Sequence, residues 1–385
     1  MTEKMPFRLD STTHPCYRRS NYGARNRSDA TSTPSIYAKG ENLMRKVFLA
    51  QALALALLLP VAGQAADYRP EVAAHRGASG YLPEHTLPAK AMAYAMGVDY
   101  VEQDVVMSKD GKLMVMHDIL VDTTTDVAKK FPDRHRDNGR YYACDFTYDE
   151  LRSLRVTERF DPKTGKPVFS GRFPDSPIAY QIPSLEEEFY QVQGLNKSTG
   201  KNVGVYVEVK EPDFFMNQGL DILKATIDTL TKFGYNAPDS KAILQIFDYE
   251  AVVRARELGW KGQLCMLVTA GGQGAKDDKA RHQWLTTPEG IKEVAKYATI
   301  YAPNFNLLAV PTADGNGYTL SNLGDLAREN GMKLHSWTLR KDSLPKGFKD
   351  FNEVLDVSFK QLKVEGMFSD FPDLLVEYLK ANNLR

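Results

Sequence analysis

The chain has 385 residues, of which 43% are apolar and 25% charged, a composition that suits a globular protein with a large core. Its 49 basic residues balance its 49 acidic residues, so charge gives no reason to expect binding to nucleic acid or to an anionic membrane. The three cysteines lack the spacing of a zinc site, and they neither demand nor exclude a disulfide.

The N-terminal residues are not expected to belong to the fold. Residues 1–43 are polar and show no hydrophobic period, which predicts a disordered or non-native leader. Residues 44–65 carry two basic residues, then an apolar run, then small residues up to Ala65, which is the pattern of a secretory signal peptide. The apolar run is shorter than the roughly 20 residues that a membrane-spanning helix needs. We therefore expect cleavage after Ala65 and export, with membrane anchoring as the alternative.

From residue 66 onward, short apolar strands alternate with amphipathic helices. The strands are predicted at residues 71–77, 99–106, 205–210, 242–248, 263–268, 299–304, 333–339 and 366–372. Helical patterns between them include residues 86–97, 184–195, 219–234, 249–259, 290–298 and 322–331. Eight such units predict a (β/α)8 TIM barrel over residues 66–385. An open doubly wound sheet is the alternative, but it would usually show a Gly-rich turn after the first strand, and no GxGxxG is present.

A long segment interrupts this regular spacing. Residues 119–181 separate His117 and Asp118 from the next helix and are rich in Asp, Arg, Tyr and Pro. Loops of that length are usually functional or form a small subdomain. We interpret the segment as an insertion after the second-strand hairpin that lies over the barrel mouth.

The stretch "VDYVEQDVVMSKDGKLMVMHD" (98–118) predicts a hairpin that carries polar side chains in apolar strands. The Asp-Gly turn near residues 110–111 would place His117 opposite Glu102 within about one residue. Side-chain alternation places Glu102 and Asp104 on one face. Two acids and an imidazole are therefore expected to meet near the barrel opening.

Two unpaired carboxylates are costly to bury side by side, and a divalent cation removes that cost. Glu208, in the next parallel strand, offers a third oxygen ligand. Oxygen ligands without sulfur favour Ca²⁺ or Mg²⁺. The alternative is that the acids are salt-bridge partners on the barrel rim, Glu208 with Lys210 in particular.

A second histidine, His75, ends the first strand, where β/α barrels carry catalytic groups. Arg76 follows, and its guanidinium suits phosphate oxygens. The alternative is a capping histidine beside a surface arginine. Two histidines around a metal-bound anion suit phosphodiester cleavage, because one removes a proton from the nucleophile and the other protonates the leaving alkoxide.

With these residues the chain resembles the glycerophosphodiester phosphodiesterase family, and in particular its periplasmic bacterial type. The match begins with "AHRGASGYLPEHTLPAKAMAYAMGVDYVEQDVVMSKDGKLMVMHD" and continues through "IPSLEEEF", "VYVEVK", "LQIFD" and "GMFSDFPD", over nearly all of residues 70–380. The resemblance implies the following roles: His75 and His117 as the acid/base pair, Glu102, Asp104 and Glu208 as ligands of one divalent cation, Arg76 and Lys210 as phosphate contacts, and Phe247 and Trp337 as pocket walls. Calcium is favoured over magnesium.

The activity implied is hydrolysis of small glycerophosphodiesters to sn-glycerol 3-phosphate and an alcohol, in the periplasm. No nucleic-acid partner and no stable membrane insertion after processing are expected, and a homodimer is one assembly that the sequence allows. A phospholipase D-like lipid phosphodiesterase and a non-catalytic metal- or ligand-binding surface protein are the alternatives. The mostly polar insertion argues against the first, and the presence of both histidines and all three acids argues against the second. The attacking group, water or the substrate's own glycerol 2-hydroxyl, is left open.

Four further residues are interpreted as bystanders. Glu84 is expected to be structural and His85 to be a helix-entry residue rather than a catalyst. His135 and His282 lie in polar stretches and are expected to be solvated.

Overall fold

The computed structural model of the chain describes residues 68–271 and 278–385. The leader predicted at residues 1–43 and the signal peptide predicted at residues 44–65 lie outside the described residues. Within the described ranges, no helix has the length and apolar character needed to cross a membrane.

Eight parallel strands close into a barrel, as the alternation of strands and helices predicted. They are β1 (Glu71–Ala74), β2 (Tyr100–Met107), β4 (Gly204–Val209), β5 (Ala242–Ile246), β6 (Gln263–Val268), β7 (Ile300–Pro303), β10 (Lys333–Leu339) and β11 (Gly366–Ser369). Neighbours pair in the order β1-β11-β10-β7-β6-β5-β4-β2, and the pairing of β1 with β2 closes the ring. The strands are almost wholly buried, which explains why they read as continuous apolar runs.

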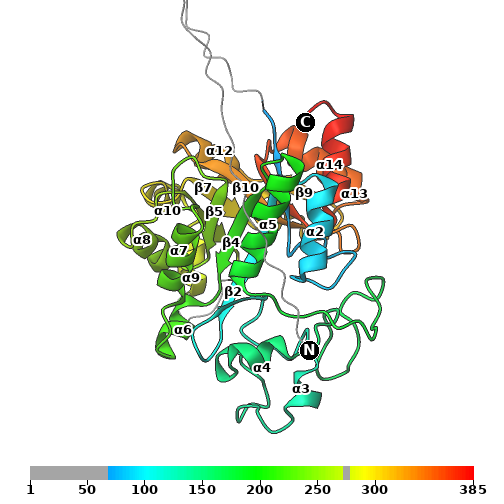
Figure 1. Cartoon of the computed structure of the whole chain (residues 1–385). Coiled ribbons are helices and arrows are strands. Elements are labelled where there is room, and N and C mark those ends of the chain that lie inside the picture. Colours follow the sequence, from blue (N-terminus) through cyan, green and yellow to red (C-terminus); the bar gives the residue numbers. More distant parts are fainter. Residues whose placement is uncertain (1–67, 272–277) are drawn as a thin grey trace, which may run out of the picture. The chain divides into compact units, whose positions relative to one another are not determined.

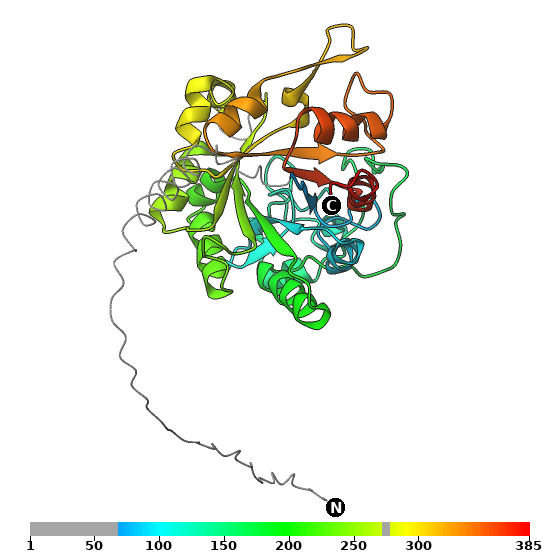
Figure 2. The same ribbon diagram turned by 90° about the horizontal axis from the view of Figure 1, so that it is seen from above.

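Helices surround the strands, as the view from above shows (Figure 2). They include α2 (Leu87–Met96), α5 (Leu185–Thr199), α7 (Ile222–Lys232), α8 (Tyr249–Glu257), α10 (Pro288–Val294), α12 (Leu323–Glu329), α13 (Phe351–Asp356) and α14 (Pro372–Ala381). Short helical segments are α6 (Pro212–Asn217), α9 (Asp278–Trp284), α11 (Phe305–Leu308) and the π-helix η2 (Val357–Gln361). Side-chain caps mark several of the helix starts; Ser184, for example, forms a capping box with Glu187 at the start of α5.

The second strand continues into the predicted hairpin. Strand β3 (Leu113–Val115) runs antiparallel to β2, with Val105 opposite Val115 and Met107 opposite Leu113, the register expected from the Asp-Gly turn. Gly111 occupies the turn with φ +77°, a conformation that glycine adopts without steric cost. A second hairpin, formed by β8 (Ala309–Pro311) and β9 (Tyr318–Leu320), follows β7 and was not expected from the sequence.

The inserted segment contains α3 (Val127–Lys130), the 3₁₀ helix η1 (Ala143–Asp145) and α4 (Tyr148–Arg152). Phe146 and Leu151 are fully buried, so the segment has apolar packing of its own. Figure 1 shows α3 and α4 gathered at the end of the barrel opposite the C-terminus. Segment side chains contact Asp118 and Asp370, which follow β3 and β11, so the segment lies over the barrel mouth, where the strands end.

The far end of the barrel is filled by aromatic and aliphatic side chains. The rings of Tyr206 and Phe368 lie 4.7 Å apart, and Tyr100 packs edge-on against Tyr206. Cys265 belongs to the same buried cluster, and Cys144 is buried in the insertion; neither forms a disulfide within the described ranges. This packed layer leaves the polar side chains of the strands gathered at the mouth.

Candidate active site

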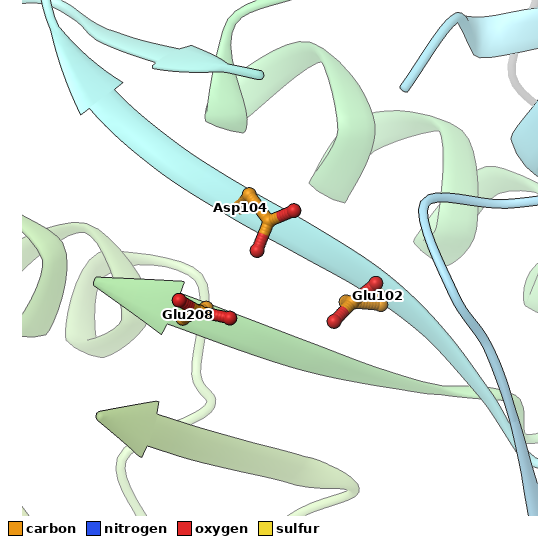
Figure 3. Close-up of side chains that lie close together, drawn as sticks. All are labelled: Glu102, Asp104 and Glu208. Carbon is orange, nitrogen blue, oxygen red and sulfur yellow. The ribbon is translucent and has the colours of Figure 1, made fainter. Parts of the chain in front are cut away.

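Three acidic side chains meet between two neighbouring strands. Glu102 and Asp104 alternate onto one face of β2, and Glu208 on β4 is the register partner of Asp104. A carboxylate oxygen from each lies within 4.8 Å of the others, and all three residues are buried, Asp104 completely. Figure 3 shows the three carboxylates over the adjoining strands. The structure thus brings together the three acids that the sequence singled out.

The proximity of these acids perturbs their ionisation. Burial raises the pKa of Glu208 to about 8, with Lys210 opposing this rise and Asp104 adding to it. Burial and the charges of Asp104 and Glu208 raise the pKa of Glu102 well above its ordinary value. Burial would also raise the pKa of Asp104, but Lys210 and His85 outweigh it and hold that pKa well below the ordinary value. The cluster therefore resists carrying three negative charges at neutral pH.

The donor set fits a hard divalent cation. Its ligand atoms are all carboxylate oxygens, which Ca²⁺ and Mg²⁺ prefer. Oδ1 of Asp104 is buried and has no hydrogen-bond partner within the described ranges. A cation among the carboxylates would satisfy this oxygen and neutralise the repulsion that raises the neighbouring pKa values.

Neighbouring groups bind both carboxylate oxygens of Glu102. The backbone N–H of Arg76 donates to Glu102 at 2.6 Å, and the Gln245 amide donates to its second oxygen at 3.0 Å. Arg76 and Gly77 both have positive φ, and a Cβ on Gly77 would approach the backbone of Ala89 to 2.9 Å. The tight turn after β1 therefore requires glycine, and it presents the Arg76 N–H to the acid cluster.

His85 has a larger part in the site than helix entry. It is buried, and its Nε2 lies 2.7 Å from Oδ2 of Asp104, while Lys90 contacts its Nδ1 at 3.2 Å. Partners of this kind orient a metal ligand. Glu84 is structural, as expected: it accepts hydrogen bonds from Arg76 and Arg159.

Two histidines each pair with a carboxylate through Nδ1. His75 follows β1 and lies 2.5 Å from Asp370, which follows β11. His117 follows β3 and lies 2.5 Å from Asp118. Because a carboxylate only accepts hydrogen bonds, each Nδ1 carries the proton and Nε2 is left as the basic atom.

The charges around these dyads keep the imidazoles neutral and the acids ionised. Burial, reinforced by Arg76, lowers the pKa of His75 to about 4. Partial burial and the charges of Arg76 and Lys210 lower the pKa of His117 to about 3. Burial would raise the pKa of Asp370, but Arg340, His75 and Arg172 outweigh it and hold that pKa well below its ordinary value. Neutral imidazoles can accept a proton at physiological pH.

Both histidines and two of the three clustered acids line one cavity of about 310 Å³. His75, Arg76, His117, Glu102 and Glu208 form its polar wall. Its other wall includes two aromatic rings, Phe247 and Trp337, whose centroids lie 5.3 Å apart in an edge-to-face arrangement. The cavity thus has a charged side and an apolar side.

Two predicted residues take positions other than those expected. Lys210 is buried, and its Nζ donates to Oε1 of Glu208 at 2.5 Å, so the contact between them that was considered as an alternative is present; Lys210 is not among the residues that line the cavity. His282 is buried rather than solvated, because α9 turns it inward, where it accepts a hydrogen bond from the Thr269 N–H at 3.3 Å. His135 is exposed, as expected.

Sequence reasoning missed several groups of the site. They are Asp370, Arg340 and Gln245 on the barrel, and Arg159 and Arg172 in the insertion. For Asp370 a signal existed, since it directly follows the last strand in "SDFP". The insertion arginines carry no spacing that would have identified them.

Known proteins resemble this chain in sequence. The model of the "Glycerophosphoryl diester phosphodiesterase family" matches residues 75–374, so the chain belongs to that family. A glycerophosphodiester phosphodiesterase of Haemophilus influenzae is 42% identical over 80% of this chain and 90% of its own length. One of Treponema pallidum is 36% identical over 80% of this chain and 91% of its own length.

Solved structures share the fold. One is a putative glycerophosphoryl diester phosphodiesterase from Silicibacter pomeroyi, with TM-score 0.62 and 18% identity, covering 82% of this chain and 97% of its own. Another is an Oleispira antarctica phosphodiesterase in complex with the product sn-glycerol-3-phosphate, with TM-score 0.54 and 19% identity, covering 81% of this chain and 98% of its own.

We expect Glu208→Gln to become more stable relative to the wild type as pH rises from 5 to 8 in the presence of a chelator. The folded wild type keeps the Glu208 proton up to about pH 8, whereas the unfolded chain loses it near 4.5. Across that interval the unfolded state binds fewer protons, so rising pH favours unfolding of the wild type, by at most about 1.4 kcal/mol per pH unit. Denaturant unfolding of both proteins measures the difference, and a difference independent of pH would contradict the assignment.

Proposed function

We propose that this family member is an exported, metal-dependent phosphodiesterase that hydrolyses glycerophosphodiesters to sn-glycerol 3-phosphate and an alcohol. The observation that carries the proposal is a cavity lined by His75, His117, Glu102 and Glu208, with Asp104 beside Glu208 and an aspartate paired with each histidine. The names of the curated relatives and the product bound in the Oleispira antarctica enzyme support this substrate class.

The cavity suits an anionic diester on its charged side. The Arg76 guanidinium lines this side, and its planar fork matches phosphate oxygens. Lys210 adds positive charge behind Glu208. When bound by Glu102, Asp104 and Glu208, a divalent cation supplies charge that stabilises the non-bridging phosphate oxygens in the transition state.

The two imidazoles divide the proton transfers. One, in its neutral form, takes the proton of the attacking water or hydroxyl at Nε2. The other acts as an imidazolium, the form that the negative charge of a bound phosphate favours, and its Nε2–H protonates the leaving alkoxide. Asp370 and Asp118 keep each Nδ1 protonated and each ring oriented, so that Nε2 is the atom that exchanges protons. Phe247 and Trp337 offer an apolar wall to the glycerol or to the alcohol.

Calcium is the ion that we favour, because it tolerates irregular coordination by several carboxylates better than magnesium does.

We place the protein in the periplasm on the basis of the signal peptide predicted at residues 44–65. No observation favours the lipid-cleaving or the non-catalytic alternative, and both serve as outcomes of the assay below.

Purified protein is expected to release sn-glycerol 3-phosphate from glycerophosphocholine. A chelator should abolish this activity, and added Ca²⁺ should restore it. An enzyme-coupled assay for glycerol 3-phosphate measures the release. Cleavage of intact phospholipid vesicles with little action on glycerophosphocholine would favour the lipid-cleaving alternative. Saturable binding of glycerophosphocholine without turnover would favour the non-catalytic alternative, and either result would overturn the proposal.

We expect His75→Ala and His117→Ala each to lower kcat by about 10²- to 10⁴-fold, the contribution usual for general acid–base groups. Each variant should remain folded by circular dichroism. His135→Ala is the matched control, since His135 is exposed and lies in the insertion; its kcat should equal that of the wild type. Near-normal turnover of either of the first two variants would remove that histidine from the mechanism.

A further inference from the structure

Two arginines of the inserted segment reach the carboxylates that hold the histidines. Arg159 donates from Nη1 to Asp118 at 2.6 Å, and Arg172 donates from Nη2 to Asp370 at 2.7 Å. Asp118 and Asp370 belong to different parts of the barrel, after β3 and after β11 respectively. One segment outside the barrel therefore contacts both dyads.

The two contacts have the same arrangement. In each carboxylate, Oδ1 faces the histidine Nδ1 and Oδ2 accepts from the arginine. The acid therefore bridges the insertion and the imidazole. A carboxylate fixed at Oδ2 has little freedom to rotate, so the ring bound at Oδ1 is also fixed.

Both arginines are largely withdrawn from water. The side chain of Arg159 is 16% exposed and that of Arg172 is 5% exposed. Their charges are therefore weakly screened, and they help to keep both aspartates ionised. Other ion pairs of the insertion are more exposed to water. In the pair of Arg134 with Glu150, for example, the arginine side chain is 40% exposed.

Each arginine also has a second anchor. The guanidinium of Arg159 forms two hydrogen bonds to Glu84, at 2.7 and 3.0 Å, and that of Arg172 binds Asp342 at 2.8 Å. These anchors hold the planar groups in place before substrate arrives. Such pre-organisation distinguishes a positioning group from a mobile surface charge.

From this geometry we propose that the insertion supplies Arg159 and Arg172 as positioning residues, which set the orientation of His117 and His75 through Asp118 and Asp370. The inference rests on the proposed hydrolase function. Neither arginine is a catalytic residue, because each acts through a carboxylate. The insertion then contributes residues that orient the catalytic histidines, in addition to lying over the barrel mouth.

The two dyads are supported unequally. Asp370 also accepts from Arg340, a residue of the barrel, at 2.6 Å. Asp118 receives Arg159 and the neutral hydroxyl of Thr123 at 2.9 Å, and within the described ranges no second cation bonds to it. Loss of Arg159 should therefore harm turnover more than loss of Arg172.

The test is a double-mutant cycle on kcat for release of sn-glycerol 3-phosphate from glycerophosphocholine. Arg159→Gln is expected to lower kcat on the order of 10- to 100-fold, with KM nearly unchanged, as loss of an orienting partner usually does. In an Asp118→Asn background, Arg159→Gln should lower kcat less than about twofold, because the contact between residue 118 and His117 is already weakened. Arg172→Gln should cost less than Arg159→Gln in the wild-type background.

Arg134→Gln is the matched control: it removes an ion pair from the same segment, away from both dyads, and kcat should stay at the wild-type value. If Arg159→Gln does not fold, Arg159→Lys replaces it; this variant keeps the charge but cannot span Glu84 and Asp118, so an intermediate kcat is expected.

Unchanged kcat in Arg159→Gln, or equal losses in the two backgrounds, would overturn the positioning inference while an active wild type upholds the proposed function. A wild type that releases no glycerol 3-phosphate would overturn the proposed function itself. The two failures are therefore distinguishable.

Discussion

The mutual repulsion of three buried carboxylates is the constraint on which the rest of this site depends. Strand pairing places Asp104 beside Glu208, and side-chain alternation adds Glu102, so the barrel itself enforces the proximity. Without a cation the cluster must hold protons, as the raised pKa values of Glu102 and Glu208 indicate. Burying this cluster in the barrel wall lowers the free energy of unfolding. The cluster is nevertheless useful, because a cation bound there can in turn bind an anionic substrate.

Around the histidines the charges attract instead of repelling, because each aspartate lies beside an arginine. Each imidazole has a carboxylate at Nδ1, and each carboxylate has an arginine at its other oxygen. These linked pairs are largely shielded from water, so their geometry is rigid and their electrostatics are strong. The site thus combines three mutually repelling acids, which a cation would neutralise, with two hydrogen-bonded His–Asp dyads whose Nε2 atoms can exchange protons.

The fold and the inner part of the site could be predicted because they follow from local patterns. Strand periodicity indicated all eight barrel strands, and the Asp-Gly turn set the β2–β3 register, from which His117 and Glu102 line the same cavity. Arg159 and Arg172 escaped prediction because their importance arises from contacts with residues 41 and 198 positions away, which no short pattern encodes. Asp370 differs, since it directly follows the last strand, a position that could have identified it. His282 was misjudged for a related reason: its neighbours in sequence are polar, but α9 turns it into the core.

A crystal structure of the protein with Ca²⁺ and sn-glycerol 3-phosphate tests the central claim most directly. The ion is expected among the carboxylates of Glu102, Asp104 and Glu208, with a phosphate oxygen as a further ligand and the imidazoles of His75 and His117 on either side of the phosphorus. An ion bound elsewhere, or a phosphate seated away from both imidazoles, would contradict it.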